Sequence, residues 1–214
     1  MKFINVHTHH KSNDNSTISI LNCEPNSIDF NIPFSTGIHP WNINEEEINS
    51  EIHFIEQQLP LKNCFAIGEC GLDKLCKTDY ELQLMIFKKQ IHLSEKHQKP
   101  LIIHCVKAFE EIFYLKKTLK PQQPWIIHGF NKNSQVALSL IKNGCFLSFG
   151  KALITDTKLQ EVFFNIPLEA AFLETDAAEI TIEAIYKKAA VIKGIETEKL
   201  QEKIHQNFNT IFIK

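Results

Sequence analysis

The sequence predicts an α/β fold in which eight parallel strands form an irregular barrel and helices fill most of the connections. Two observations lead to this prediction. Short apolar runs alternate with amphipathic segments along the 214 residues, and a repeated strand-then-helix order implies parallel strands with right-handed crossovers. Five of the runs also end on histidines or acids, and the carboxyl ends of parallel barrel strands face a common pocket.

Each predicted strand is a short apolar run that is flanked by polar or turn-forming residues. We expect strands at residues 2–6, 17–22, 33–37, 64–68, 100–104, 125–128, 145–148 and 170–174. The first two connections between strands are too short for full helices. The barrel is therefore expected to be irregular on that side.

The later connections have the residue spacing of amphipathic helices. We expect helices at residues 45–58, 79–99, 109–119, 134–143 and 157–164, and a closing helical region at 180–212. Thr78 followed by Glu81 fits a capping box at the start of the second helix. No linker or repeat interrupts the chain, and its 43% hydrophobic content suits one large core. A single domain over residues 1–214 is predicted.

Charge and composition argue against several classes of protein. The formal net charge is −2, and every one of the 23 basic residues is a lysine. The chain therefore has no global positive field for nucleic acid and no guanidinium group to clamp a phosphate. No segment reaches the roughly 18 apolar residues of a membrane span, and the amino terminus does not resemble a signal peptide. We expect a cytoplasmic monomer whose six cysteines are reduced thiols.

Histidines and acids at the ends of the apolar runs are candidate metal ligands. They are His7, His9, Glu69, His104, His128 and Asp176. In an extended chain side chains alternate, so the two imidazoles of a His-x-His segment point the same way and can bind one ion. A carboxylate that closes a buried strand needs a cation beside it. Each residue also has a plain structural alternative: a surface histidine pair, a salt bridge to lysine, or a histidine packed in the core.

The order of these motifs resembles a known family. The most specific segments are Ala66-Ile67-Gly68-Glu69-Cys70-Gly71-Leu72-Asp73 and Leu173-Glu174-Thr175-Asp176-Ala177, together with Val6-His7-Thr8-His9, Gly37-Ile38-His39-Pro40-Trp41, Pro100-Leu101-Ile102-Ile103-His104-Cys105 and Ile127-His128-Gly129-Phe130. Over nearly the whole chain they look like the signatures of the TatD family of metal-dependent hydrolases, within the amidohydrolase superfamily. The resemblance implies a TIM-type (β/α)8 barrel.

The resemblance also implies a site for two divalent ions, which could be Mg²⁺, Mn²⁺ or Zn²⁺. By analogy, one ion would be held by His7, His9 and Asp176. Glu69 would bridge the two ions, and the remaining pair of histidines, His104 and His128, would hold the second. Asp176 and Glu69 are the expected catalytic residues, with Asp176 taking a proton from the attacking water.

The family resemblance implies a phosphodiesterase of the deoxyribonuclease type that acts on DNA ends, with His39 and Lys107 expected to bind the substrate. Two departures from the family pattern bear on this reading. Val106 stands where an arginine usually follows the histidine of the fifth strand, and Ala178 replaces a proline after the Thr-Asp-Ala segment. The loop that follows this segment in the family is also missing here, and the shortened loops favour an alternative, hydrolysis of a small amide, ester or phosphoester. A third hypothesis is a metal-binding protein without catalytic activity.

Overall fold

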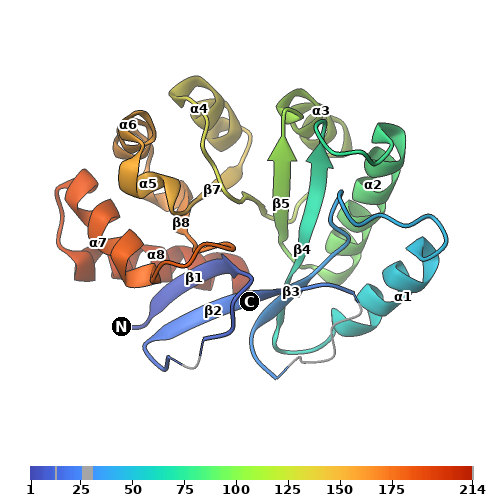
Figure 1. Ribbon diagram of the computed structural model, residues 1–214, viewed down its shortest axis with the longest axis horizontal. Coiled ribbons are helices and arrows are strands. Elements are labelled where there is room, and N and C mark those ends of the chain that lie inside the picture. The colour runs from blue at the N-terminus through green and yellow to red at the C-terminus, as the bar shows by residue number, and fades with distance from the viewer. Residues whose placement is uncertain (13, 26–30, 214) are drawn as a thin grey trace. The chain divides into compact units, whose positions relative to one another are not determined.

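The computed structural model describes residues 1–12, 14–25 and 31–213. Eight strands, β1 to β8, are hydrogen-bonded to one another in the order of the sequence. Figure 1 shows the ribbon in colours that run from the N-terminus to the C-terminus. The chain forms two compact units, Met1–Leu21 with Ile127–Lys214, and Asn22–Ile126. In the described part of the chain, no helix is long and apolar enough to cross a membrane.

The first unit contains both ends of the chain. Its strands are β1 (Phe3–Thr8), the start of β2 (Thr17–Cys23), β7 (Cys145–Phe149) and β8 (Ala171–Leu173). Its helices are α4 (Ser134–Lys142), α5 (Ala152–Thr155), α6 (Thr157–Asn165), a short 3-10 turn (Leu168–Ala170), α7 (Ile182–Lys193) and α8 (Thr197–Phe212). β1 pairs in parallel with β2, and β7 with β8. A parallel bridge between Thr8 and Asp176 joins β1 to the segment after β8.

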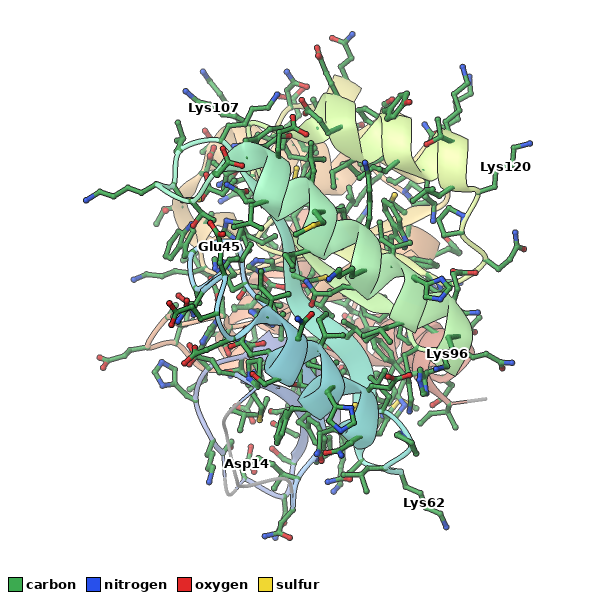
Figure 2. The ribbon with its side chains drawn as sticks, turned by 90° about the vertical axis from the view of Figure 1, so that its right-hand side faces the viewer. Asp14, Glu45, Lys62, Lys96, Lys107 and Lys120 are labelled. Carbon is green, nitrogen blue, oxygen red and sulfur yellow. The ribbon has the colours of Figure 1, made fainter. Side chains whose placement is uncertain are left out.

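The second unit contains the strands and helices of the middle of the chain. Its strands are the end of β2, β3 (Phe34–Thr36), β4 (Cys64–Asp73), β5 (Leu101–Val106) and most of β6 (Trp125–Ile127). Its helices are α1 (Ile48–Gln58), α2 (Tyr80–His97) and α3 (Phe109–Leu119). β4 pairs in parallel with β3 and β5, and α2 packs along β4. Lys62, Lys96, Lys107 and Lys120 are exposed on this unit (Figure 2).

The predicted end of the fourth strand is wrong. β4 continues past Gly68 to Asp73, because Cys70, Leu72 and Asp73 remain buried and pair with β5. Glycine at this point favours close strand contact: a Cβ on Gly68 would lie 2.7 Å from the carbonyl oxygen of Ile102. Glu69 therefore lies inside a buried strand, and not at its end.

Two predicted helix signals also need correction. Asp79, and not Thr78, caps α2, since its side chain accepts a hydrogen bond of 2.9 Å from the backbone N–H of Leu82. The closing helical region is two helices, because Gly194 adopts the left-handed conformation (φ 64°) that ends α7. The described residues of the first two connections contain no helix, as predicted.

Candidate metal sites

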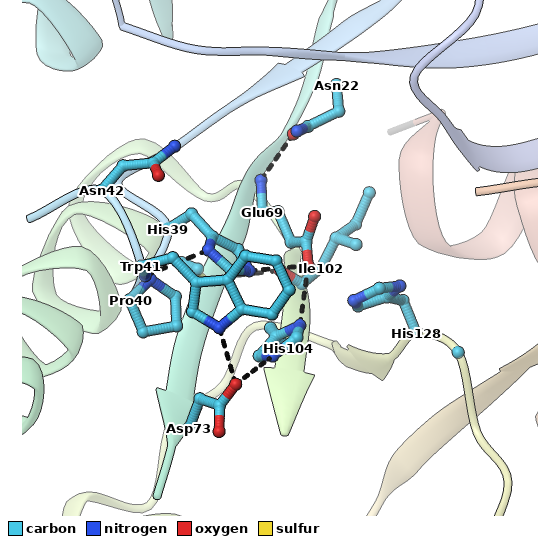
Figure 3. Close-up of polar contacts among 12 residues, drawn as sticks. Asn22, His39, Pro40, Trp41, Asn42, Glu69, Asp73, Ile102, His104 and His128 are labelled. Atoms are coloured by element: carbon cyan, nitrogen blue, oxygen red, sulfur yellow. Dashed lines mark hydrogen bonds and ion pairs between the residues drawn. The ribbon is translucent and has the colours of Figure 1, made fainter. Parts of the chain in front are cut away.

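Glu69 is the centre of a cluster in the second unit. Its Oε1 atom lies 2.9 Å from Nδ1 of His104 and 3.1 Å from Nε2 of His39 (Figure 3). The ligand atoms that these three side chains offer all lie within 4.8 Å of one another. The backbone N–H of Glu69 donates a hydrogen bond of 2.7 Å to Oδ1 of Asn22. A buried carboxylate between two imidazoles is a donor set that suits Zn²⁺ or Mn²⁺.

Glycines and an amide side chain fix the backbone around this cluster. Gly71 has φ of 139°, and a Cβ there would lie 2.1 Å from the carbonyl oxygen of His104, so only glycine lets β4 and β5 approach so closely. Gln90 of α2 accepts from the N–H of Ile38 (2.8 Å) and donates to its carbonyl (3.1 Å). The residue before His39 is thereby held from both sides.

A backbone hydrogen bond defines the tautomer of a neutral His39. Its Nδ1 atom accepts a hydrogen bond of 3.1 Å from the backbone N–H of Trp41. In a neutral imidazole the proton is then on Nε2, the nitrogen that faces Glu69. The substrate-binding role of His39 stays a prediction; its place beside Glu69 and His104 also makes it one of three residues that could hold a metal ion.

Two further residues contact the far side of His104. Oδ2 of Asp73 lies 3.3 Å from Nε2 of His104 and accepts a hydrogen bond of 2.6 Å from Nε1 of Trp41 (Figure 3). Burial alone would raise the pKa of Asp73, but hydrogen bonds from Trp41, the backbone of Leu75 and His104 outweigh it and lower that pKa. Sequence reasoning missed these roles, although both residues lie in the motifs that carry the family resemblance.

A second cluster lies in the first unit. Oδ1 of Asp176 is 3.4 Å from Nε2 of His7 and 3.4 Å from Nε2 of His9. His128 joins them: its ring centroid is 4.5 Å from that of His7, and the ligand atoms of His7, His128 and Asp176 lie within 4.8 Å of one another. This set also mixes imidazole nitrogens with one carboxylate, the chemistry of a Zn²⁺ or Mn²⁺ site.

Backbone hydrogen bonds position Asp176. Its N–H donates to the carbonyl of His7 (3.1 Å), and its carbonyl accepts from the N–H of His9 (3.1 Å). Burial alone would raise the pKa of Asp176, but hydrogen bonds from His7 and His9 and the nearby charge of His128 hold it well below its usual range. Asp176 is therefore ionised at neutral pH.

Buried Glu174 supports His128. Its Oε1 atom accepts a hydrogen bond of 2.6 Å from the N–H of Gly129 and lies 3.5 Å from Nδ1 of His128. No role was predicted for Glu174 from its sequence context. Its place two residues before Asp176 is the only signal that could have indicated one.

Within each unit, several of the six predicted ligands lie together, and His39 lies with those of the second unit. Asp176 lies with His7, His9 and His128 in the first unit, and Glu69 with His104 and His39 in the second. The resemblance implied that His104 and His128 hold the second ion. How the ligands divide between ions, and the bridging role of Glu69, stay predictions. Lys107 is exposed just after β5, with φ of 52°.

A parallel β/α fold with histidines and carboxylates gathered on its strands is typical of metal-dependent hydrolases of the barrel type. Within that class, the chain belongs to the TatD related DNase family, whose family model matches residues 1–213. The sequence prediction of the family is confirmed.

Individual relatives are similar at modest identity. An "uncharacterized metal-dependent hydrolase" of Haemophilus influenzae is 27% identical over 161 residues, 71% of this chain and 61% of the relative. Another of Buchnera aphidicola is 29% identical over 172 residues, 78% of this chain and 62% of the relative. The chain thus spans about three fifths of the length of these curated relatives.

A solved structure confirms the fold class. The crystal structure of YjjV, a TatD homologue from Escherichia coli, matches with a TM-score of 0.81 at 18% identity, and the match covers 98% of this chain and 97% of that one. With eight parallel strands in sequence order, the protein has the predicted TIM-type (β/α)8 fold.

Proposed function

We propose that the protein is a divalent-metal-dependent hydrolase that cleaves phosphodiester bonds at DNA ends. The observation that carries this proposal is the pair of clusters, each with two imidazoles and one carboxylate whose ligand atoms lie within 4.8 Å of one another. Membership of a family described as TatD related DNase supports the same reaction. Mixed nitrogen and carboxylate ligands favour Zn²⁺ or Mn²⁺ over Mg²⁺.

The residues have separate tasks in this proposal. His7, His128 and Asp176, with His9 beside them, would hold one ion, and His39, Glu69 and His104 would hold another. When bound, such ions polarise the scissile group and lower the pKa of water. Asp176 is ionised and 43% exposed, so its carboxylate can accept a proton from the attacking water. Lys107 offers an exposed positive charge for a substrate phosphate.

Single-stranded ends are the proposed form of the DNA. The chain has no arginine and a net charge of −2, so it lacks the counterion release that holds long duplexes. Trp41 is 61% exposed, and its ring lies edge-on to His39 and His104, with centroids 4.9 and 5.7 Å away. An exposed, fixed indole beside a metal cluster offers a stacking surface for an unpaired base.

A hydrolase for a small substrate is the second candidate. The observation that favours it is the sequence at the two departures from the family, where Val106 and Ala178 replace residues of the family pattern. Without those residues, fewer contacts hold a long phosphate backbone. The same two clusters would then act on an amide, ester or phosphomonoester.

A hydrolase screen with added Mn²⁺ or Zn²⁺ tests the proposal. It compares a model phosphodiester, a phosphomonoester, a lactone and short single-stranded DNA, using the parent, Glu69→Gln and the control Glu45→Gln, whose carboxylate is exposed (Figure 2). We expect cleavage of the phosphodiester and the DNA by the parent and the control, and its loss in Glu69→Gln and with chelator.

Other outcomes separate the alternatives. Hydrolysis of the lactone or monoester alone would favour a small substrate, and metal binding without hydrolysis would favour a non-catalytic protein. A Glu69→Gln variant that binds as much metal as the parent and keeps full activity would rule out a metal-bridging role. Nanomolar binding of long duplex DNA at physiological salt would contradict the preference for single strands.

A further inference from the structure

His104 has a carboxylate at each ring nitrogen. Its Nδ1 atom is 2.9 Å from Oε1 of Glu69, and its Nε2 atom is 3.3 Å from Oδ2 of Asp73 (Figure 3). A neutral imidazole carries one proton, so one nitrogen donates while the other presents a lone pair. The side that holds the proton decides which nitrogen can bind a metal ion.

Asp73 is held rigidly. Its Oδ1 atom accepts a hydrogen bond of 2.7 Å from the backbone N–H of Leu75, and its Oδ2 atom accepts the 2.6 Å bond from Trp41. Gln83 of α2 fixes the backbone of Asp73 from both sides, accepting from its N–H (2.8 Å) and donating to its carbonyl (3.1 Å). The carboxylate is buried, so its place beside His104 is set by strand, helix and indole together.

We propose that Asp73 is a positioning residue for His104. By accepting the proton on Nε2, it directs the lone pair of Nδ1 toward Glu69, where a divalent ion would bind, and the indole of Trp41 keeps the carboxylate in place. Metal-binding histidines commonly donate their second ring N–H to a carboxylate, which fixes the tautomer and strengthens the ligand. The inference rests on the proposed metal site at Glu69 and adds two residues that support it.

The geometry also explains two features of the sequence. β4 extends to Asp73, four residues beyond Glu69, and thereby places one carboxylate near each ring nitrogen of His104. Gly71 pairs with His104, and the absence of a side chain on Gly71 lets β4 lie close to β5 at this position. Trp41, in contrast, is a largely exposed residue whose indole N–H reaches a buried carboxylate.

The test measures metal affinity and the His104 tautomer, without any substrate. Competition with a chromogenic chelator gives the dissociation constants for Zn²⁺, and ¹⁵N NMR of the metal-free protein gives the protonated nitrogen of His104. We expect Asp73→Asn to weaken binding of one ion about 10- to 100-fold and to reduce the population with the proton on Nε2. Trp41→Phe, which keeps a ring and removes the N–H, should shift both readouts in the same direction by less.

Two controls make the result decisive. Asp79→Asn alters an exposed helix cap nearby and should change neither readout, since asparagine also caps helices well. Glu69→Gln should lose one ion. If it does and both Asp73→Asn and Trp41→Phe bind Zn²⁺ like the parent, the positioning role is overturned while the metal site stands. If Glu69→Gln binds normally, the metal site itself is wrong. Should Asp73→Asn fail to fold, Trp41→Phe decides the question alone.

Discussion

The phenol of Tyr186 forms two hydrogen bonds with the backbone of Ile4. Its oxygen accepts from the N–H of Ile4 at 3.2 Å and donates to the carbonyl of the same residue at 3.1 Å, although 182 positions separate the two in sequence. The ring also packs edge-on against Phe3, with centroids 5.0 Å apart. One side chain of α7 thus satisfies both polar groups of a residue in β1, the strand that carries His7.

Replacing Tyr186 by phenylalanine tests this contact. The ring would stay, but the N–H and carbonyl of buried Ile4 would lose a partner, which costs about 1–3 kcal/mol in the free energy of unfolding. Urea unfolding of parent and variant measures the difference. Tyr114→Phe is the matched control, because Tyr114 is 66% exposed and surface changes usually stay within about 0.5 kcal/mol. Equal losses in both variants would contradict the assignment.

The buried carboxylate of Glu51, in α1, should make the stability of the protein depend on pH. Its side chain is buried, and its Oε2 atom has no hydrogen-bond partner among the described residues. Burial raises the pKa of Glu51, and the charges of Glu47 and Glu24 raise it further. A raised pKa in the folded state means that the neutral form is favoured. The stability that it contributes is present below the unfolded-state pKa and is lost as the pH rises through the folded-state pKa.

We therefore expect Glu51→Gln to be more stable than the parent at pH 7 and equal to it near pH 4. Each unit by which folding raises the pKa costs the parent about 1.4 kcal/mol at neutral pH. Urea midpoints at several pH values measure the difference, with exposed Glu46→Gln as the control. A variant that is less stable than the parent at pH 7 would show that the Glu51 carboxylate makes a favourable contact.

Two substitutions of Trp41 distinguish base stacking on its ring from its hydrogen bond to Asp73. Stacking of one base on an aromatic side chain is worth about 1–3 kcal/mol, so Trp41→Leu should raise KM for short single-stranded DNA. Trp41→Phe keeps a ring and should raise it much less. An abasic oligonucleotide serves as the control substrate and should show no such difference. If leucine and phenylalanine raise KM equally, the ring is not a stacking surface.

The sequence predicted the fold well because the strands are short apolar runs with a regular alternation of helices. It missed features that depend on neighbours distant in sequence. Gly68 looked like the end of a strand, yet β4 continues because glycine lets it lie against Ile102. Thr78 and Asp79 are adjacent cap formers, and only the bond to Leu82 decides between them.

The candidate site was predicted less completely than the fold. The residues at strand ends could be named because histidine and carboxylate after apolar runs are unusual. The resemblance placed His7 and His9 with Asp176, but the neighbours of the other residues depend on which strands lie close together: His128 lies with His7, and His39 with Glu69. The role of Asp73 depends on the register of β4 against β5, which no local pattern determines.

The Asp176→Asn variant tests whether Asp176 is needed for turnover or only for metal binding. Its own cluster would keep its histidines and the cluster around Glu69 would be intact, so we expect at least one ion to remain bound. General base catalysis typically contributes roughly 10² to 10⁴-fold, and turnover should fall in that range. Elemental analysis and kcat on the substrate found in the screen measure the two effects. Because hydrogen bonds from His7 and His9 hold the pKa of Asp176 well below its usual range, we expect the loss in turnover to be similar at every pH of the assay.

The fold should tolerate this change. Asp176 is in the left-handed conformation (φ 53°), which asparagine adopts readily, and its side chain is 43% exposed. Asp156→Asn, at the exposed cap of α6, is the matched control and should keep both stability and turnover. The structural alternative is that Asp176 serves only to pair with His7 and His9. A variant that melts earlier than the parent but turns over substrate at the parent rate would favour that alternative, because the carboxylate would then stabilise the strand ends without taking part in the reaction.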